Sequence, residues 1–340
     1  MKILIQTFLE TKFFEKTWFL ASLRKTLIMP TIAYIDHPDC LLHEMGTGHP
    51  ERPSRINAIE NQMRESHLMD SVHHYEAPLA TREQLARVHD VQYIDKVLNF
   101  NDQDEYVYLD PDTMQTPQSL PAALRAAGAL IHATDLVLTN QHKVAFCNIR
   151  PPGHHALPDR AMGFCFFNNV AVGVAHAIEK YGLERVAILD FDVHHGNGTE
   201  AIFTDDPRVM LCSTFQHPFY PYSGADTISD HIINVPLPAY SAGDVFREAV
   251  TKLWLPALEQ FAPQMLFISA GFDAHEQDNI SYLRLDEEDY SWVTEEILAI
   301  ANKHAEGRIV STLEGGYELD ALGRSVVAHL KVLMYSFSDK

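Results

Sequence analysis

The sequence predicts an α/β protein with a mostly parallel central sheet whose two faces are covered by helices. Three observations lead to this prediction. From about residue 121, short apolar runs typical of buried strands alternate with longer segments of helical pattern. No internal repeat or low-complexity linker divides the chain after about residue 30. Polar side chains gather directly after four expected strands, at the edge where ligands bind in such sheets.

The expected elements follow from apolar runs and helical periodicity, taken in chain order. Strands are predicted at 31–35, 143–149, 185–189, 208–215, 265–269 and 309–313. Helices are predicted at 121–139, 168–181, 198–203, 244–261, 286–305 and 321–335. The first of these helices is rich in Ala and Leu, and the second is followed by Gly182, a residue type that commonly ends helices. The helix at 286–305 carries acidic residues in its first turn, where the helix dipole favours them.

The composition of the 340 residues, 46% apolar and 21% charged, is typical of a soluble globular protein. The net charge of −20 argues against nucleic acid as a partner, because phosphate binding requires basic patches. The charge leaves two alternatives open: it attracts cationic substrates, or it only keeps the protein in solution. Four widely spaced cysteines without a CxxC pair predict buried free thiols and a reducing, cytoplasmic location.

Residues 1–29 are apolar and aromatic but are interrupted by Glu10, Lys12, Glu15 and Lys16. No uncharged run is long enough to span a bilayer, so neither a membrane span nor a signal peptide is expected. An amphipathic helix, on the domain or on a membrane surface, and a non-native extension are both consistent with the pattern. We favour an extension without a role in catalysis, followed by a single domain over residues 30–340.

The stretch 186–195 carries the strongest chemical signal, because an apolar strand runs directly into acids and histidines. Asp190, Asp192 and His194 are spaced two apart, and alternate side chains of an extended backbone point the same way. This pattern indicates a metal site, for which Asp192 and His194 suit zinc best. Asp273, after a later strand, supplies a third ligand and leaves a fourth position for water and a substrate oxygen. The alternative for the stretch alone is a strand that runs into a polar turn.

The other polar clusters supply groups for proton transfer. The adjacent His154 and His155 suit proton transfer to and from zinc-bound water, with Asp190 and Asn197 available to fix their tautomers. Tyr317, after two glycines, suits donation to a developing oxyanion. Together the parts describe hydrolysis of an unactivated carbonyl by metal-bound water.

With these residues in place, the chain resembles the zinc-dependent histone deacetylase and acetylpolyamine amidohydrolase superfamily, in its class II-like or bacterial branch. The resemblance runs from residue 48 to residue 317, and its five ordered blocks are RPPGHHA (150–156), GFCFFNN (163–169), DFDVHHGNGT (190–199), SAGFD (269–273) and LEGGY (313–317). It implies the three-layer arginase-deacetylase α/β fold, with the active site at the carboxyl ends of the strands. It also implies hydrolysis of an N-acetyl amide to an amine and acetate, with one zinc ion per chain.

The resemblance implies a role for each matching position. It makes Asp192, His194 and Asp273 the zinc ligands, His155 the general base and acid, His154 its electrostatic partner beside Asp190, and Tyr317 the carbonyl-polarising residue. Asn197 stands where class I enzymes have aspartate, as in the class II and bacterial branches. A structural potassium ion is further implied near Asp190, Asp192, His194 and Ser213.

The resemblance also implies a substrate tunnel. Its expected residues are the aromatic walls Phe164 and Tyr220, the neighbouring Gly163, the rim acid Asp112 and the gatekeeper Ile280. The family usually has phenylalanine where Tyr220 stands. Polyamine-selective relatives can carry an acid at the gatekeeper position, so Ile280 favours acetyl-lysine in peptides or proteins. The charge of −20 favours free acetylated polyamines, so both substrates stay open, with acetyl-lysine slightly preferred.

Two other functions remain as alternatives. An arginase-type ureohydrolase of the same fold would hold two manganese ions, but it needs an aspartate where Gly196 stands and further acids near Asp273, where Phe272 and Ala274 intervene. A non-catalytic binder of acetylated amines would lack the tyrosine or the paired histidines, and all of these are present. The sequence leaves the oligomeric state open.

Overall fold

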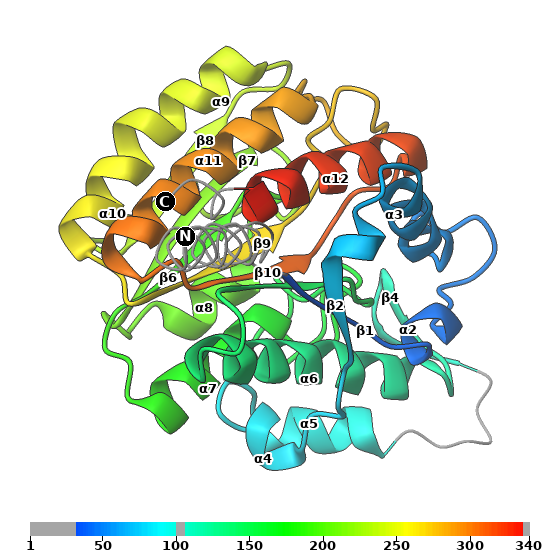
Figure 1. Cartoon of the computed structure of the whole chain (residues 1–340). Coiled ribbons are helices and arrows are strands. Elements are labelled where there is room, and N and C mark those ends of the chain that lie inside the picture. Colours follow the sequence, from blue (N-terminus) through cyan, green and yellow to red (C-terminus); the bar gives the residue numbers. More distant parts are fainter. Residues whose placement is uncertain (1–31, 100–105, 336–340) are drawn as a thin grey trace, which may run out of the picture.

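The computed structural model describes residues 32–99 and 106–335, and an eight-stranded sheet forms the centre of this part of the chain (Figure 1). Every pairing in the sheet is parallel. In sheet order the strands are β2 (Val72–Glu76), β1 (Ile32–Asp36), β5 (Val144–Cys147), β10 (Ile309–Leu313), β9 (Met265–Ala270), β6 (Val186–Asp190), β7 (Val209–Gln216) and β8 (Ile232–Leu237). A separate antiparallel hairpin joins β3 (Val107–Asp110) to β4 (Thr113–Gln115).

Helices cover both faces of this sheet, which gives three layers (Figure 1). One face carries α2 (Asp39–Leu42), α4 (Arg82–Leu85), α5 (Val91–Leu98), α6 (Ser119–Leu138), α7 (Asn169–Tyr181) and α8 (Asn197–Phe203). The other face carries α3 (Ser54–Glu65), α9 (Gly243–Ala249), α10 (Leu255–Phe261), α11 (Glu287–His304) and α12 (Leu319–Tyr335). A 3₁₀ turn at Met69–Ser71 precedes β2. The predicted α/β class with a parallel sheet is therefore confirmed.

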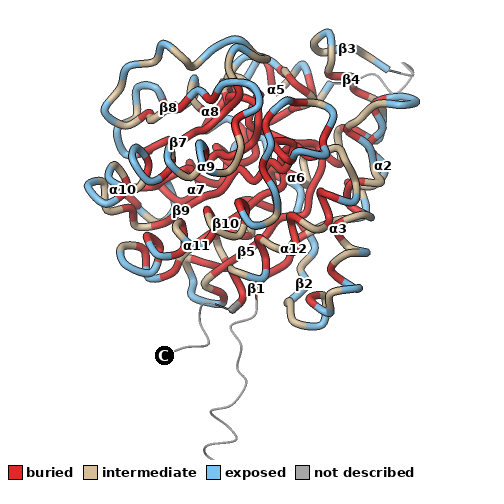
Figure 2. The backbone as a smooth tube through the Cα atoms, turned by 90° about the horizontal axis from the view of Figure 1, so that it is seen from above, coloured by how far each residue is buried: buried red, intermediate tan, exposed pale blue. Residues whose placement is uncertain are grey.

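The middle strands are buried along their whole length. Every residue of β5, β6, β7, β9 and β10 is buried. Such strands are apolar on both faces because helices pack on both sides, and the buried side chains accordingly form two clusters, one on each face. In Figure 2 the buried backbone fills the middle of the molecule, whereas exposed backbone lies on the outer helices and loops. This burial is the reason that these strands stand out in the sequence as continuous apolar runs.

Most elements predicted after residue 121 are present, with ends shifted by one or two residues. The exception is the helix expected at 244–261, where the π-helical turn Val250–Trp254 separates α9 from α10. A π turn keeps the chain helical, so apolar periodicity does not reveal it. The four cysteines are free and buried, as predicted.

The elements that sequence reasoning missed lie mainly at the edges of the sheet. The edge strand β2 is only partly buried and reads VHHYE, without an apolar run. The opposite edge strand β8 contains Pro236, and a proline argues against a strand unless the strand lies at an edge. The hairpin β3–β4 and helices α2 to α5 were also not predicted.

The N-terminal segment 1–29 lies outside the described residues, so its assignment as an extension, like the domain boundary at residue 30, stays a prediction. Within residues 32–99 and 106–335, no helix combines the length and the apolar character needed to cross a membrane.

Asp286 begins helix α11, and its removal should destabilise the fold without touching the pocket. The Asp286 carboxylate accepts the N–H groups of Glu288 at 2.9 Å and Asp289 at 3.2 Å. We expect Asp286→Ala to lower the free energy of unfolding by about 1 kcal/mol, and Asp286→Asn to retain most of it, because asparagine is an equally good N-cap. Denaturant unfolding measures both. Equal stability of Asp286→Ala and the unchanged protein would contradict this account of the helix start.

Candidate metal centre and active site

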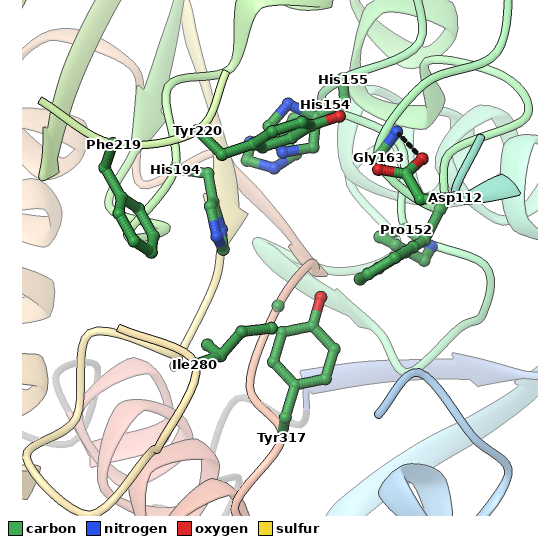
Figure 3. A pocket seen from close by; sticks show the side chains of 12 residues that line it. Asp112, Pro152, His154, His155, Gly163, His194, Phe219, Tyr220, Ile280 and Tyr317 are labelled. Atoms are coloured by element: carbon green, nitrogen blue, oxygen red, sulfur yellow. Dashed lines mark hydrogen bonds between the residues drawn. The ribbon is translucent and has the colours of Figure 1, made fainter. Parts of the chain in front are cut away.

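Side chains from five strand ends meet in one pocket at the carboxyl edge of the sheet (Figure 3). The loops after β5, β6, β7, β9 and β10 line it together with the hairpin β3–β4. The pocket has a volume of about 220 Å³ and is lined by Asp112, Pro152, His154, His155, Gly163, Phe164, His194, Phe219, Tyr220, Ile280, Gly315 and Tyr317. All the residues that we predicted to bind substrate are among them. Asp190 and Asn197 are not, because they lie behind the paired histidines.

The three predicted metal ligands lie together beside this pocket. Asp192, His194 and Asp273 each offer one ligand atom, and these atoms lie within 4.8 Å of one another. In residues 32–99 and 106–335 this is the only group of three or more His, Cys, Asp or Glu residues that could hold a metal ion in this way. His194 turns Nδ1 toward both carboxylates, at 3.0 Å from Asp192 and 3.2 Å from Asp273.

A turn, rather than an extended strand, brings Asp192 and His194 to this place. Strand β6 ends at Asp190, whose Oδ1 accepts the N–H of Asp192 at 3.1 Å. In the same way Oδ1 of Asp192 accepts the N–H of His194 at 2.8 Å. Bonds from an aspartate to the backbone two residues on are typical of tight turns. The sequence argument from alternating side chains was therefore wrong about the backbone, although the residues that it named do converge.

The buried carboxylates create a demand for a cation that zinc would meet. Asp192 and Asp273 are at most 1% exposed. Burial and the nearby charge of Asp192 raise the pKa of Asp273 to about 6. Among the described residues, the buried Oδ2 of Asp273 receives no well-aligned hydrogen bond, although Nδ1 of His194 lies 3.2 Å from it. Carboxylate and imidazole are ligands that zinc accepts in catalytic sites, so the residues present fit this ion.

Gly315 allows the two carboxylates to approach the backbone after β10. Its N–H donates to Oδ2 of Asp192 at 2.8 Å. A Cβ atom at this position would lie 2.1 Å from Oδ2 of Asp273 and 2.6 Å from Oδ2 of Asp192. Any side chain here would therefore push the ligand atoms apart.

The paired histidines have different hydrogen-bond partners, and their pKa values are shifted in opposite directions. Nδ1 of His155 donates to Oδ1 of Asn197 at 2.7 Å, which leaves Nε2 free to accept a proton. Burial, together with the charges of His154 and His194, lowers the pKa of His155 well below its usual value. Burial acts in the same direction on His154, but Asp192 and Asp190 outweigh it and raise the pKa of His154. Nδ1 of His154 donates to Oδ2 of Asp190 at 3.0 Å.

Aromatic rings form the walls of the pocket. The rings of Phe164 and Tyr317 meet edge to face, with 6.1 Å between the ring centres. The rings of Tyr220 and His155 also meet edge to face, with 5.3 Å between their centres. Phe219, which sequence reasoning did not assign a role, stacks on the ring of His194 at 5.4 Å. The walls therefore suit a narrow apolar chain.

Acidic groups stand at the mouth of the pocket. Oδ1 of Asp112 accepts the N–H of Gly163 at 3.1 Å, so this acid is fixed to the loop that carries Phe164 (Figure 3). Asp110 precedes Asp112 by two residues in the chain, and its Oδ1 accepts the N–H of Asp112. Burial and these two acids raise the pKa of the Tyr220 hydroxyl, which stays protonated. Ile280 brings no charge to the opposite side.

Two buried acids behind the pocket were missed, Glu314 in the LEGGY block and Glu51 near the start of the resemblance. Glu314 accepts the N–H groups of Gly153 at 2.7 Å and His154 at 3.2 Å, and so holds the histidine loop. Glu51 forms a buried bidentate ion pair with Arg150. Such pairing partners lie far apart in the chain, so local patterns give no signal for them.

Two further residues of the strand-end clusters have separate environments. Ser213 pairs in register with Asp190, and its buried Oγ has no hydrogen-bond partner among the described residues. His195 faces away from the pocket, where Ser223 and Glu200 bind its two ring nitrogens.

Known proteins are similar to this chain in sequence and in fold. Residues 49–333 match the family model described as the histone deacetylase domain. The chain is 38% identical over 277 residues to the histone deacetylase-like amidohydrolase of Pseudomonas aeruginosa, which covers 79% of this chain and 73% of the relative. It is 33% identical over 322 residues to the polyamine deacetylase HDAC10 of Mus musculus, covering 88% of this chain and 46% of that protein. The crystal structure of the HDA15 HD domain superposes with a TM-score of 0.85 at 32% identity, over 90% of each chain.

Gly315→Ala tests the close approach at the ligand cluster. The added methyl group should displace Asp192 and Asp273, because no space exists for a Cβ atom. We expect the zinc affinity to fall at least about tenfold, so that a competing chelator at a concentration that leaves the unchanged protein loaded removes zinc from this variant, as measured by elemental analysis. Gly182→Asn, in the open left-handed turn after α7, should keep the full content. Full zinc occupancy in Gly315→Ala would refute the packing argument.

Proposed function

Because the chain belongs to the histone deacetylase domain family of amide hydrolases, we propose that it removes acetyl groups from N-acetylated amines with one bound zinc ion. One observation carries the proposal. The paired histidines, His194 and Tyr317 line a single pocket, and the ligand atoms of Asp192 and Asp273 lie within 4.8 Å of that of His194.

Asp192, His194 and Asp273 would hold the zinc ion. When bound, zinc lowers the pKa of a water molecule and polarises a carbonyl oxygen. We further propose a structural potassium ion near Asp190 and Ser213, since the unpartnered Oγ of Ser213 is an oxygen ligand suited to such an ion.

The protein's own groups would then move protons. His155 is neutral because it is buried, so its Nε2 accepts the proton of the attacking water and later returns it to the leaving amine. His154, kept charged by Asp192 and Asp190, stabilises the negative charge that develops nearby. Desolvation raises the pKa of Tyr317 well above its usual value, so its hydroxyl stays protonated and donates to the developing oxyanion.

The pocket supports an extended acetylated chain as the substrate. Phe164 and Tyr220 leave room for a methylene chain between aromatic walls. The apolar Ile280 offers no counter-charge for a secondary ammonium, which favours acetyl-lysine in peptides or proteins. The net charge of −20 and the rim acids favour acetylated polyamines, and the similarity to a polyamine deacetylase supports this second candidate.

Two alternatives are less well supported. A ureohydrolase would need an aspartate at position 196, but a Cβ atom on Gly196 would lie 2.4 Å from Oδ2 of Asp190. A non-catalytic binder would have no use for the different protonation of His154 and His155. We assign the activity to a single domain over residues 30–340, and the buried free thiols favour a reducing, cytoplasmic location.

Substitutions in the pocket should separate catalysis from metal binding. We expect Tyr317→Phe and His155→Ala each to lower turnover of an acetyl-lysine peptide at least about 100-fold while one zinc ion per chain stays bound. Asp192→Ala should instead release the zinc. Steady-state kinetics and elemental analysis measure the two effects. Undiminished turnover in both Tyr317→Phe and His155→Ala would contradict the proposed roles.

The gatekeeper position decides between the two substrate classes. We expect the unchanged enzyme to hydrolyse an acetyl-lysine peptide with a higher kcat/KM than N-acetylated putrescine or spermidine. Ile280→Glu should shift this ratio toward the polyamines at least about tenfold, because the new carboxylate pairs with their ammonium groups. Ile280→Gln is the uncharged control. A preference for polyamines in the unchanged enzyme would reverse our assignment of the substrate.

A further inference from the structure

Asp278 is a buried acid that binds two loops of the pocket at once. It follows strand β9, and its side chain lies almost out of contact with solvent, with the residue 5% exposed. Its Oδ2 accepts the N–H groups of Tyr317 at 2.6 Å and Glu318 at 3.1 Å, and its Oδ1 accepts the N–H of Ile280 at 3.1 Å. One carboxylate therefore joins the loop after β9 to the loop after β10.

Two of the three residues that Asp278 holds form a partition between two cavities. Ile280 and Tyr317 lie side by side at one wall of the pocket (Figure 3). They also line a second groove of about 580 Å³, to which Asp278 itself belongs. The guanidinium of Arg55 lies 4.8 Å from the centre of the Tyr317 ring and the ring of Phe164 meets it edge to face, so these contacts restrain the ring. The hydrogen bonds to Asp278 restrain the backbone of the partition instead.

The backbone before Tyr317 needs such support. Tyr317 lies between the end of β10 at Leu313 and the start of α12 at Leu319, outside any regular element. It follows Gly315 and Gly316, and Gly316 has φ of +121°, a region open mainly to glycine. Arg55 holds the glycine stretch by donating to the carbonyl oxygens of Gly316 at 2.6 Å and Glu314 at 2.5 Å, but neither bond reaches Tyr317 itself. The bond from the Tyr317 N–H to Asp278 fixes the residue directly at its own backbone.

We propose that Asp278 is a positioning residue that sets the place of the Tyr317 hydroxyl, a role that rests on the proposed function of Tyr317 in polarising the acetyl carbonyl. The same carboxylate holds Ile280 at the adjoining wall. Asp278 does not reach the reacting atoms itself; it acts through the backbone of Tyr317, whose hydroxyl does, and through that of Ile280 beside it. A displacement of about 1 Å in a reacting group can lower turnover about 100-fold, so the effect is measurable.

The test is a double-mutant cycle between Asp278 and Tyr317 in the zinc-loaded, full-length enzyme. Asp278→Ala removes all three acceptor bonds, and Asp278→Asn keeps one oxygen, which can serve only one of the two loops. We expect each variant to lower kcat about 10- to 100-fold, with KM changed by less than roughly threefold, because the interaction matters in the transition state. In the Tyr317→Phe background the same substitutions should lower kcat by less than roughly twofold, since no hydroxyl is left to misplace.

Asp286→Ala is the matched control. It removes a carboxylate that also accepts two backbone N–H groups in the same part of the chain but caps α11 instead of the pocket loop. It should lower stability and leave kcat unchanged. A purely structural role for Asp278 would give the same result as this control, and that outcome would overturn the proposal.

Other outcomes are equally decisive. Equal effects of the Asp278 substitutions in the presence and absence of the Tyr317 hydroxyl would overturn the positioning role while leaving the proposed function intact. Full turnover in Tyr317→Phe alone would instead refute the mechanism on which the inference rests. If neither Asp278 variant folds, amide hydrogen exchange in the unchanged enzyme still tests the contact. Slow exchange at Tyr317 and Glu318 supports it, and exchange at the rate of a free peptide overturns it.

Discussion

The burial of two like-charged carboxylates within reach of one imidazole is the constraint on which this structure depends. Asp192 and Asp273 are excluded from solvent, and among the described residues one oxygen of Asp273 receives no well-aligned hydrogen bond. Charged groups in such surroundings are costly unless a cation or a proton neutralises them. This cost raises the pKa of Asp273, and zinc bound between the three ligands would offset the cost.

The surrounding structure can be understood as the means of holding that cluster. The parallel sheet brings its strand ends to one edge, and short side-chain-to-backbone bonds then fix each loop. Asp190 and Asp192 shape the turn of the ligand loop, Glu314 holds the histidine loop, and Asp278 holds the tyrosine loop. Buried acids thus serve two purposes here, because some offer their oxygens to a metal and others to backbone N–H groups.

The sequence predicted the parts whose signals are local. Buried central strands appear as apolar runs, and the polar residues directly after them, such as Asp192 and His154, could be placed at one edge from the parallel topology alone. Edge strand β8 could not be predicted because Pro236 interrupts its pattern. Glu51 and Asp278 could not be assigned either, since their partners Arg150 and Tyr317 are distant in the chain and the bonds depend on tertiary structure. The turn at Asp190 was misjudged because an alternating pattern looks the same in a strand and in successive aspartate turns.

The most direct test of the account is X-ray diffraction from crystals of the zinc-loaded protein, with data collected on both sides of the zinc absorption edge. The account predicts one anomalous peak per chain, bound by carboxylate oxygens of Asp192 and Asp273 and by Nδ1 of His194, with His155 and Tyr317 facing it across the pocket. A peak at another place, or two metal peaks about 3.5–4 Å apart as in two-metal hydrolytic sites, would contradict it.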